Sequence, residues 1–76
     1  MNSEQFYVDW TYQDRQQINM HDHDLIKTCY EEQDFKVLVS FYEKRSEFYK
    51  DYPSLAGLFS DQLPRAKRYA IKDSLK

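Results

Sequence analysis

The chain has 76 residues, of which 17% are aromatic, and a formal net charge of −2. A chain this short has room for one domain with a modest core, because only about 60% of its surface is buried on folding. Its single cysteine excludes a disulfide within the chain, and one glycine with two prolines leaves few tight turns. We therefore predict a mainly α fold rather than a β-sandwich.

We expect no signal for export or membrane insertion in this protein. Met1 leads into the polar run NSEQ, which lacks the basic and apolar regions of a signal peptide. No segment approaches the ~18 apolar residues that span a bilayer. Cys29 is expected to be a small buried apolar residue, and one free thiol suits a reducing compartment. We expect a cytoplasmic protein that neither spans nor binds a membrane.

Residues 1–20 form a predicted N-terminal aromatic arm. Within it, QFYVDWTY at 5–12 alternates apolar and less apolar residues with the period of a β-strand. No comparable run follows, so this strand would pair across a two-fold axis or extend another protein's sheet. A helical or extended segment lying over the helices is the alternative. In either case Phe6 and Trp10 are expected to pack on the helix predicted over residues 34–52, described below. Residues 13–20 are expected to form a loop or loose helical turn.

A helix is predicted over residues 22–33, with Asp22 or Asp24 as its N-cap. The run HDHD at residues 21–24, where this helix is predicted to begin, offers imidazole and carboxylate groups of the kind that bind zinc. A metal site needs three or four converging ligands, however, and the chain has no further histidine. We therefore expect a capped, solvated loop here, with no metal and no cofactor.

The stretch DFKVLVSFYEKRSEFYKDY, residues 34–52, is the predicted central amphipathic helix. Its apolar residues cover an arc of roughly 200°, whereas an ordinary surface helix has a stripe of about 100°. Such a helix is expected to be covered on two sides, by the rest of the fold or by a second copy of the chain. Since no glycine or proline separates it from the preceding helix, one continuous helix over 24–51 stays open as an alternative.

Two further helices are predicted after the central one, which ends because Pro53 lacks a backbone donor. The first is a short turn over residues 54–59, and the second covers residues 62–75, with Pro64 tolerated in its first turn. The predicted fold is thus a single domain, residues 1–76, of three or four helices around the central helix.

Arg45 falls near the middle of the apolar arc of the central helix, where a buried unpaired guanidinium would be very costly. Three surroundings are open: an ion pair with an N-terminal acid such as Asp9 or Asp14, a path between aromatic rings to the surface, or a partner-binding face. The last agrees with the tyrosine and arginine content of interface hot spots.

Charge is distributed unevenly along the chain. Residues 1–34 carry eight acids and two bases, a net of −6, whereas residues 35–76 carry nine bases and five acids, a net of +4. Arg65, Arg68 and Lys72 fall on one side of the last predicted helix. They suggest nucleic-acid contact of the helix-turn-helix type, although the turn before them lacks a well-placed glycine and the overall charge is negative.

The sequence has no glycine-rich phosphate loop, no GxSxG motif and no recognisable cysteine–histidine arrangement, so we expect no enzyme. The wide apolar arc and the seven tyrosines favour a small regulatory or accessory protein, of the adaptor or inhibitor type, that binds another protein, with a homodimer as one form. The alternative is a nucleic-acid-binding regulator. The predicted partner-binding residues are Arg45, Tyr42, Tyr49, Tyr52 and Trp10.

Overall fold

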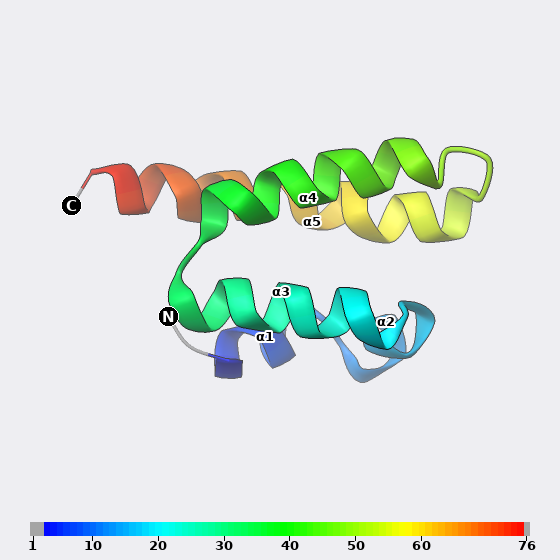
Figure 1. Cartoon of the computed structure of the whole chain (residues 1–76), viewed down its shortest axis with the longest axis horizontal. Coiled ribbons are helices and arrows are strands. Elements are labelled where there is room, and N and C mark those ends of the chain that lie inside the picture. The colour runs from blue at the N-terminus through cyan, green and yellow to red at the C-terminus, as the bar shows by residue number, and fades with distance from the viewer. Residues whose placement is uncertain (1–2, 76) are drawn as a thin grey trace. The chain divides into compact units, whose positions relative to one another are not determined.

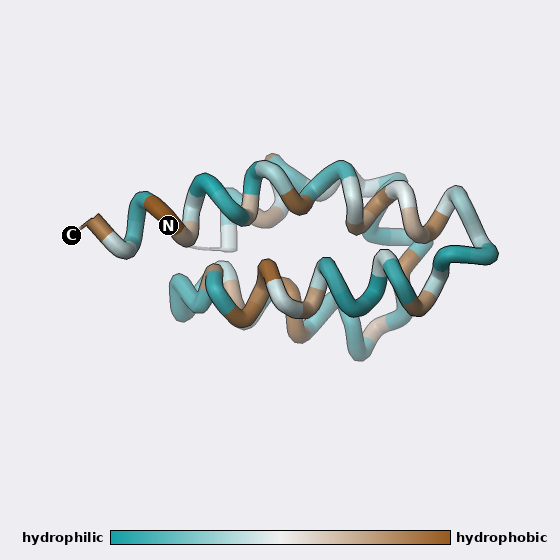
Figure 2. Tube along the Cα trace, turned by 90° about the horizontal axis from the view of Figure 1, so that it is seen from above, coloured by the Kyte–Doolittle hydropathy of each residue, from teal (hydrophilic) through white to brown (hydrophobic). Residues whose placement is uncertain are grey.

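The structure, a computed structural model, describes residues 3–75 and contains only α-helices there, which confirms the mainly α prediction (Figure 1). The helices form two compact units, an N-terminal unit that ends at Asp34 and a C-terminal unit that begins at Phe35. Hydrophobic and hydrophilic stretches alternate along the helices, as Figure 2 shows. In chain order the helices are α1 (Ser3–Asp9), α2 (Tyr12–Gln17), α3 (Met20–Glu32), α4 (Phe35–Phe48) and α5 (Pro53–Ser74).

The strand predicted over residues 5–12 is wrong, because α1 and the start of α2 occupy this stretch. Phe6 and Trp10 are both fully buried and are four residues apart, a spacing that fits one side of a helix as well as alternate positions of a strand. A strand here would leave its backbone groups without a partner strand, whereas a helix satisfies them within the segment. Residues 13–17, expected to be part of a loop or loose helical turn, lie in α2, which is capped by the Thr11 hydroxyl accepting from the Asp14 N–H.

α1 packs on α3 through a buried polar contact within an aromatic cluster. The Tyr30 hydroxyl donates to Asp9 at 2.6 Å, and the Gln5 side-chain amide donates to the same carboxylate at 2.9 Å. The Phe6 ring lies 5.7 Å from the Tyr30 ring and 5.1 Å, edge-on, from the His23 ring. The Asp9 carboxylate is thus buried with two donors, which is what a buried charge needs in order to be tolerated.

α3 begins earlier than predicted, at Met20, and its cap is Asn19 rather than Asp22 or Asp24. The Asn19 side-chain oxygen accepts a 2.7 Å hydrogen bond from the Asp22 N–H, the usual N-cap geometry. Asp22 therefore lies in the first turn of α3, where a carboxylate interacts favourably with the positive end of the helix dipole.

α3 ends in a left-handed residue, which decides between two helices and the continuous helix left open over residues 24–51. Gln33 has φ 58° and ψ 37°, and its N–H donates to the Tyr30 carbonyl. The Asp34 N–H donates to the Cys29 carbonyl at 2.8 Å. These two bonds form a Schellman motif, which satisfies the last carbonyls of a helix and turns the chain away from it. Two helices are therefore formed, and the prediction that separates them near residue 34 agrees with the structure.

Replacing Gln33 by glycine is expected to stabilise the protein by about 0.5–1 kcal/mol. Glycine adopts the left-handed conformation without the Cβ penalty of about 1–2 kcal/mol, and part of this gain is offset by its greater freedom in the unfolded chain. Urea unfolding followed by circular dichroism measures the change. Gln16→Gly, inside α2, is the matched control and should destabilise by up to about 1 kcal/mol. Destabilisation by both variants would contradict the break at Gln33.

The C-terminal unit is an antiparallel pair, α4 and α5, joined by a short connection (Figure 1). Each helix buries a row of residues at the three- and four-residue spacing of one helical side. Two aromatic contacts hold the pair together: Phe35 of α4 with Tyr69 of α5 at 5.0 Å between ring centroids, and Tyr49, just after α4, stacked on Phe59 of α5 at 6.0 Å with an 11° interplanar angle. The buried rows are Phe35, Leu38 and Tyr42 on α4, and Phe59, Gln62 and Ala66 on α5.

α4 ends at Phe48, four residues before the predicted end at residue 52. Tyr52 has φ −125° and ψ 79°, outside the helical region, and Pro53 is the first residue of α5. A proline disfavours the helical conformation of the residue before it, so Tyr52 leaves the helical path as the sequence predicts. The residues between Phe48 and Tyr52 then make the turn that reverses the chain.

The separate helices predicted over residues 54–59 and 62–75 are wrong, because α5 runs without a break from Pro53 to Ser74. Pro64 therefore lies in the middle of a helix rather than in a first turn. The reason is that Phe59, Gln62 and Ala66 continue one buried row across the expected break, so ending the helix would remove part of the unit's core. Packing against α4 outweighs the local preference of proline.

Candidate binding surfaces

Arg45 lies on α4 between two phenylalanines, one turn before it and one turn after it. Its guanidinium carbon is 5.2 Å from the Phe41 ring centroid and 5.5 Å from the Phe48 ring centroid. A cation within about 6 Å of an aromatic ring is attracted by roughly 0.5–1 kcal/mol at exposed sites. Of the three surroundings predicted for Arg45, the geometry matches the path between aromatic rings to the surface.

One side of α4 carries a row of accessible apolar residues around Arg45. Val37 is 53% exposed and Phe48 is 68% exposed, and Phe41 between them is half-buried. These residues recur every four or seven positions, so they share a side of the helix next to the row that packs on α5. We call Val37, Phe41, Arg45 and Phe48 the α4 edge. α5 leaves Val37 and Phe48 of this edge open, whereas the Phe41 ring also contacts Phe59 of α5, with 6.0 Å between the ring centroids.

The structure separates the predicted partner-binding residues into accessible and inaccessible ones. Tyr42 and Trp10 are fully buried, so they belong to the core. Tyr49 is half-buried beneath its stacking contact with Phe59, whereas Tyr52 is 64% exposed at the start of α5. Arg45 is also half-buried. Of the five predicted partner-binding residues, only Tyr52 therefore has a largely exposed side chain.

The three basic residues predicted for nucleic-acid contact also differ in accessibility. Arg68 and Lys72 are exposed on α5. Arg65 is half-buried and donates a 2.8 Å hydrogen bond to the Gln62 side-chain oxygen, which ties it to the core row of its own helix. Of Arg65, Arg68 and Lys72, two rather than three are thus exposed, and nucleic-acid binding stays a prediction.

The HDHD run lies in the first turns of α3 rather than in a loop. Consecutive helical residues point about 100° apart, so the side chains diverge: His21 is exposed, Asp22 is buried and His23 packs edge-on against Phe6. The His23 Nδ1 is 3.3 Å from an Asp24 carboxylate oxygen. Within residues 3–75, no three histidine, cysteine or acidic side chains converge as metal ligands would.

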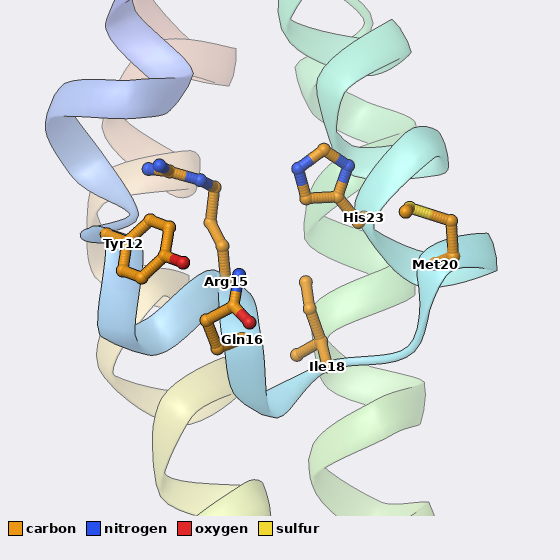
Figure 3. A pocket seen from close by; sticks show the side chains of 6 residues that line it. All are labelled: Tyr12, Arg15, Gln16, Ile18, Met20 and His23. Atoms are coloured by element: carbon orange, nitrogen blue, oxygen red, sulfur yellow. The ribbon is translucent and has the colours of Figure 1, made fainter.

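A hollow of about 210 Å³ opens on the N-terminal unit between α2 and the start of α3. Figure 3 shows Arg15 of α2 and His23 of α3 on opposite sides of it, with Ile18 from the connecting segment between them. Arg15 donates to the Trp10 carbonyl, and its guanidinium carbon lies 4.6 Å from the Tyr7 ring centroid. Arg15 is thus engaged in holding α2 against the end of α1, which is a structural role.

Cys29 is buried in α3, as predicted. Burial raises the pKa of its thiol to about 11, and the negative charges of Asp34 and Glu32 add to this effect. The thiolate is the reactive form of cysteine, so at neutral pH this side chain is chemically inert. The result fits a packing residue rather than a nucleophile or a metal ligand.

Sequence reasoning missed the two most accessible members of the α4 edge, Val37 and Phe48, as candidate contact residues. Both fall on the wide apolar arc, and the width of that arc indicates that some of it lies outside a single helix contact. The positions of these residues around the helix axis do not show which side of the arc stays exposed, because that depends on where α5 lies. Only the packing of α5 on the Phe35, Leu38 and Tyr42 row makes the choice.

Among the described residues, no helix has both the length and the apolar character needed to cross a bilayer. Comparison of the chain with protein-family models, curated proteins and solved structures found no significant match.

Proposed function

We propose that this chain is a small non-enzymatic accessory protein, of the adaptor or inhibitor type, that binds another protein through the α4 edge. The exposure of Phe48 next to Arg45, and of Val37 two turns earlier on the same side of α4, is the observation that supports it. Single exposed apolar side chains are common, but phenylalanine rings together with an arginine are residue types enriched at protein–protein interfaces. The absence of phosphate-loop and nucleophile motifs in the sequence supports the non-enzymatic part.

The chemistry of the α4 edge indicates what the partner presents. Phe48 and Val37 favour an apolar side chain, because covering them removes apolar surface from water. The guanidinium of Arg45 favours a carboxylate, which it binds with directed, charge-assisted hydrogen bonds. A stable interface covers about 800 Å² on each partner, so the edge would be its centre, with more polar residues around it.

Phe48→Ala and Arg45→Ala are expected to abolish capture of the partner, whereas Val8→Ala retains it. Phe48 is 68% exposed and Val8 is 71% exposed, so Phe48→Ala and Val8→Ala should each leave stability within about 0.5 kcal/mol. Affinity purification from cells that express the protein, with quantitative mass spectrometry of all four forms, identifies proteins lost only with the two α4 variants. Circular dichroism checks that each variant is folded.

A purified candidate partner must then bind the wild-type protein directly. Loss of a hot-spot residue costs about 2 kcal/mol or more, so calorimetry should give an affinity at least about 30-fold weaker for Phe48→Ala. Sedimentation velocity over micromolar concentrations decides whether the partner is a second copy of the chain. If folded Phe48→Ala and Arg45→Ala retain the same proteins as Val8→Ala, the α4 edge is not the binding surface.

A further inference from the structure

A groove of about 300 Å³ lies on the C-terminal unit, between the first turns of α4 and the second half of α5. Val39, Ala70 and Ile71 give it an apolar lining, and two exposed lysines, Lys36 and Lys67, complete it. Its volume is at the lower end of the ~300–1,000 Å³ of small-molecule sites. Such a groove accommodates one or two apolar side chains of a partner rather than a cofactor.

The charges of the C-terminal unit are arranged so that the groove lies at its basic end. Lys36 is the only charged residue in the first half of α4, and the second half of α5 has four basic residues against the single acid Asp73. The remaining acids lie nearer the connection between α4 and α5. A cluster of one sign of charge attracts the opposite sign and raises association rates. The acids near the connection are Glu43, Glu47, Asp51 and Asp61, and the basic residues of α5 are Arg65, Lys67, Arg68 and Lys72.

We infer that this groove binds an acidic amphipathic helix of another protein. An apolar side chain of that helix enters between Lys36 and Lys67 and covers Val39, Ala70 and Ile71. Glutamate or aspartate residues one turn away pair with the two lysines. This is the helix-in-groove mode of recognition, in which apolar anchors supply affinity and flanking charges set orientation and specificity.

This site differs from the α4 edge in position and in partner chemistry. Val39 and Val37 are two residues apart on α4, so their side chains point about 200° apart, toward different sides of the helix. The groove has lysines beside aliphatic side chains, whereas the edge has an arginine between phenylalanines. The groove proposal therefore stands or fails independently of the proposed function.

The test uses the whole protein labelled with ¹⁵N and a synthetic peptide of leucine and glutamate in which leucine recurs every third or fourth residue. Adding the peptide is expected to shift the amide resonances around Lys36–Val39 and Lys67–Ile71. Lys36→Glu combined with Lys67→Glu should weaken binding by about tenfold or more, because two attractive contacts become repulsive. Ile71→Ala removes part of the apolar lining from an exposed position and should also weaken binding.

Three controls keep the test specific. Lys44→Glu combined with Lys50→Glu makes the same change in net charge at exposed positions outside the groove and should leave the affinity within about twofold. Phe48→Ala, which tests the α4 edge, should leave peptide binding unchanged. A peptide with lysine in place of every glutamate should not bind. Circular dichroism confirms that every variant is folded.

Several results would overturn the proposal. Equal losses for the two charge-reversal pairs would mean that net charge alone attracts the peptide. Shifts away from the groove would place the peptide elsewhere. Binding to phosphatidylserine vesicles or to a random DNA duplex, with no binding of the acidic peptide, would assign the basic end to a membrane or to nucleic acid instead. Self-association that Lys36→Glu with Lys67→Glu abolishes, without peptide binding, would make a second copy the occupant.

Discussion

Replacing Tyr42 by alanine is expected to remove about 3–5 kcal/mol from the free energy of unfolding, a large part of the protein's stability. Tyr42 is fully buried on α4 and its ring lies 6.1 Å from the ring of Phe59. Truncating a buried aromatic side chain to alanine typically costs about 3–5 kcal/mol. Total stability is on the order of 4–11 kcal/mol for a domain of this length, at about 0.05–0.15 kcal/mol per residue. Urea unfolding followed by circular dichroism and tyrosine fluorescence measures the loss.

Tyr52→Ala is the matched control for Tyr42→Ala. Both tyrosines were predicted to contact a partner, but Tyr52 is 64% exposed, so its truncation should change stability by no more than about 0.5 kcal/mol. A folded Tyr42→Ala protein with nearly wild-type stability would contradict the packing of α4 on α5. It would also return Tyr42 to the set of surface residues.

Replacing Pro64 by alanine is expected to stabilise the protein by about 1–3 kcal/mol. Pro64 is exposed and lies in the interior of α5, where it removes a backbone hydrogen bond and its ring crowds the preceding turn. Proline costs about 3 kcal/mol relative to alanine in a helix interior, and some of this is offset because proline also restricts the unfolded chain. The midpoint of urea unfolding should rise accordingly.

Pro53→Ala is the control, because Pro53 is the first residue of α5, where the missing N–H has no helical partner in any case. We expect this variant to be neutral or slightly destabilised. The pair also distinguishes the continuous helix from the two predicted helices. If Pro64→Ala behaves like Pro53→Ala, Pro64 lies in a first turn and α5 is interrupted, as the sequence suggests.

The spacing of apolar residues in the sequence predicted the helices in the middle of the chain well. Apolar residues at three- and four-residue spacing marked the helices at residues 22–33 and 34–52, and the structure has α3 and α4 there with ends shifted by a few residues. Their caps were harder to identify. Asn19 and Gln33 do the capping, because several polar residues near a helix end compete for that role and small differences in backbone position select one.

The errors at the two ends of the chain have opposite causes. In the N-terminal arm, the four-residue spacing of Phe6 and Trp10 fits either a strand or a helix, so the pattern is ambiguous. In α5, the local signal of Pro64 is clear, but packing against α4 overrides it. Local preference of this kind amounts to a few kcal/mol, and burial of the continuous row Phe59, Gln62 and Ala66 against α4 exceeds it.

The candidate surfaces depend on tertiary structure more than the helices do. An aromatic residue on a predicted arc is suitable both for a core and for an interface, so the sequence alone does not separate Tyr42 from Tyr52 or Phe41 from Phe48. Their roles follow from where α5 lies against α4. The groove beside Lys36 and Lys67 is formed by two segments about thirty residues apart, and no local pattern reports their meeting.

The sequence by itself determined that the chain is mainly helical, that α4 has a wide apolar arc, and that the basic residues gather in the C-terminal half. These properties follow from composition and spacing, which act along one segment at a time. Only the tertiary structure decided that α5 is continuous, that Tyr42 and Trp10 are buried, and that Phe48 is open. The physical reason is that burial is a property of pairs of segments, because apolar surface leaves water only where another element covers it.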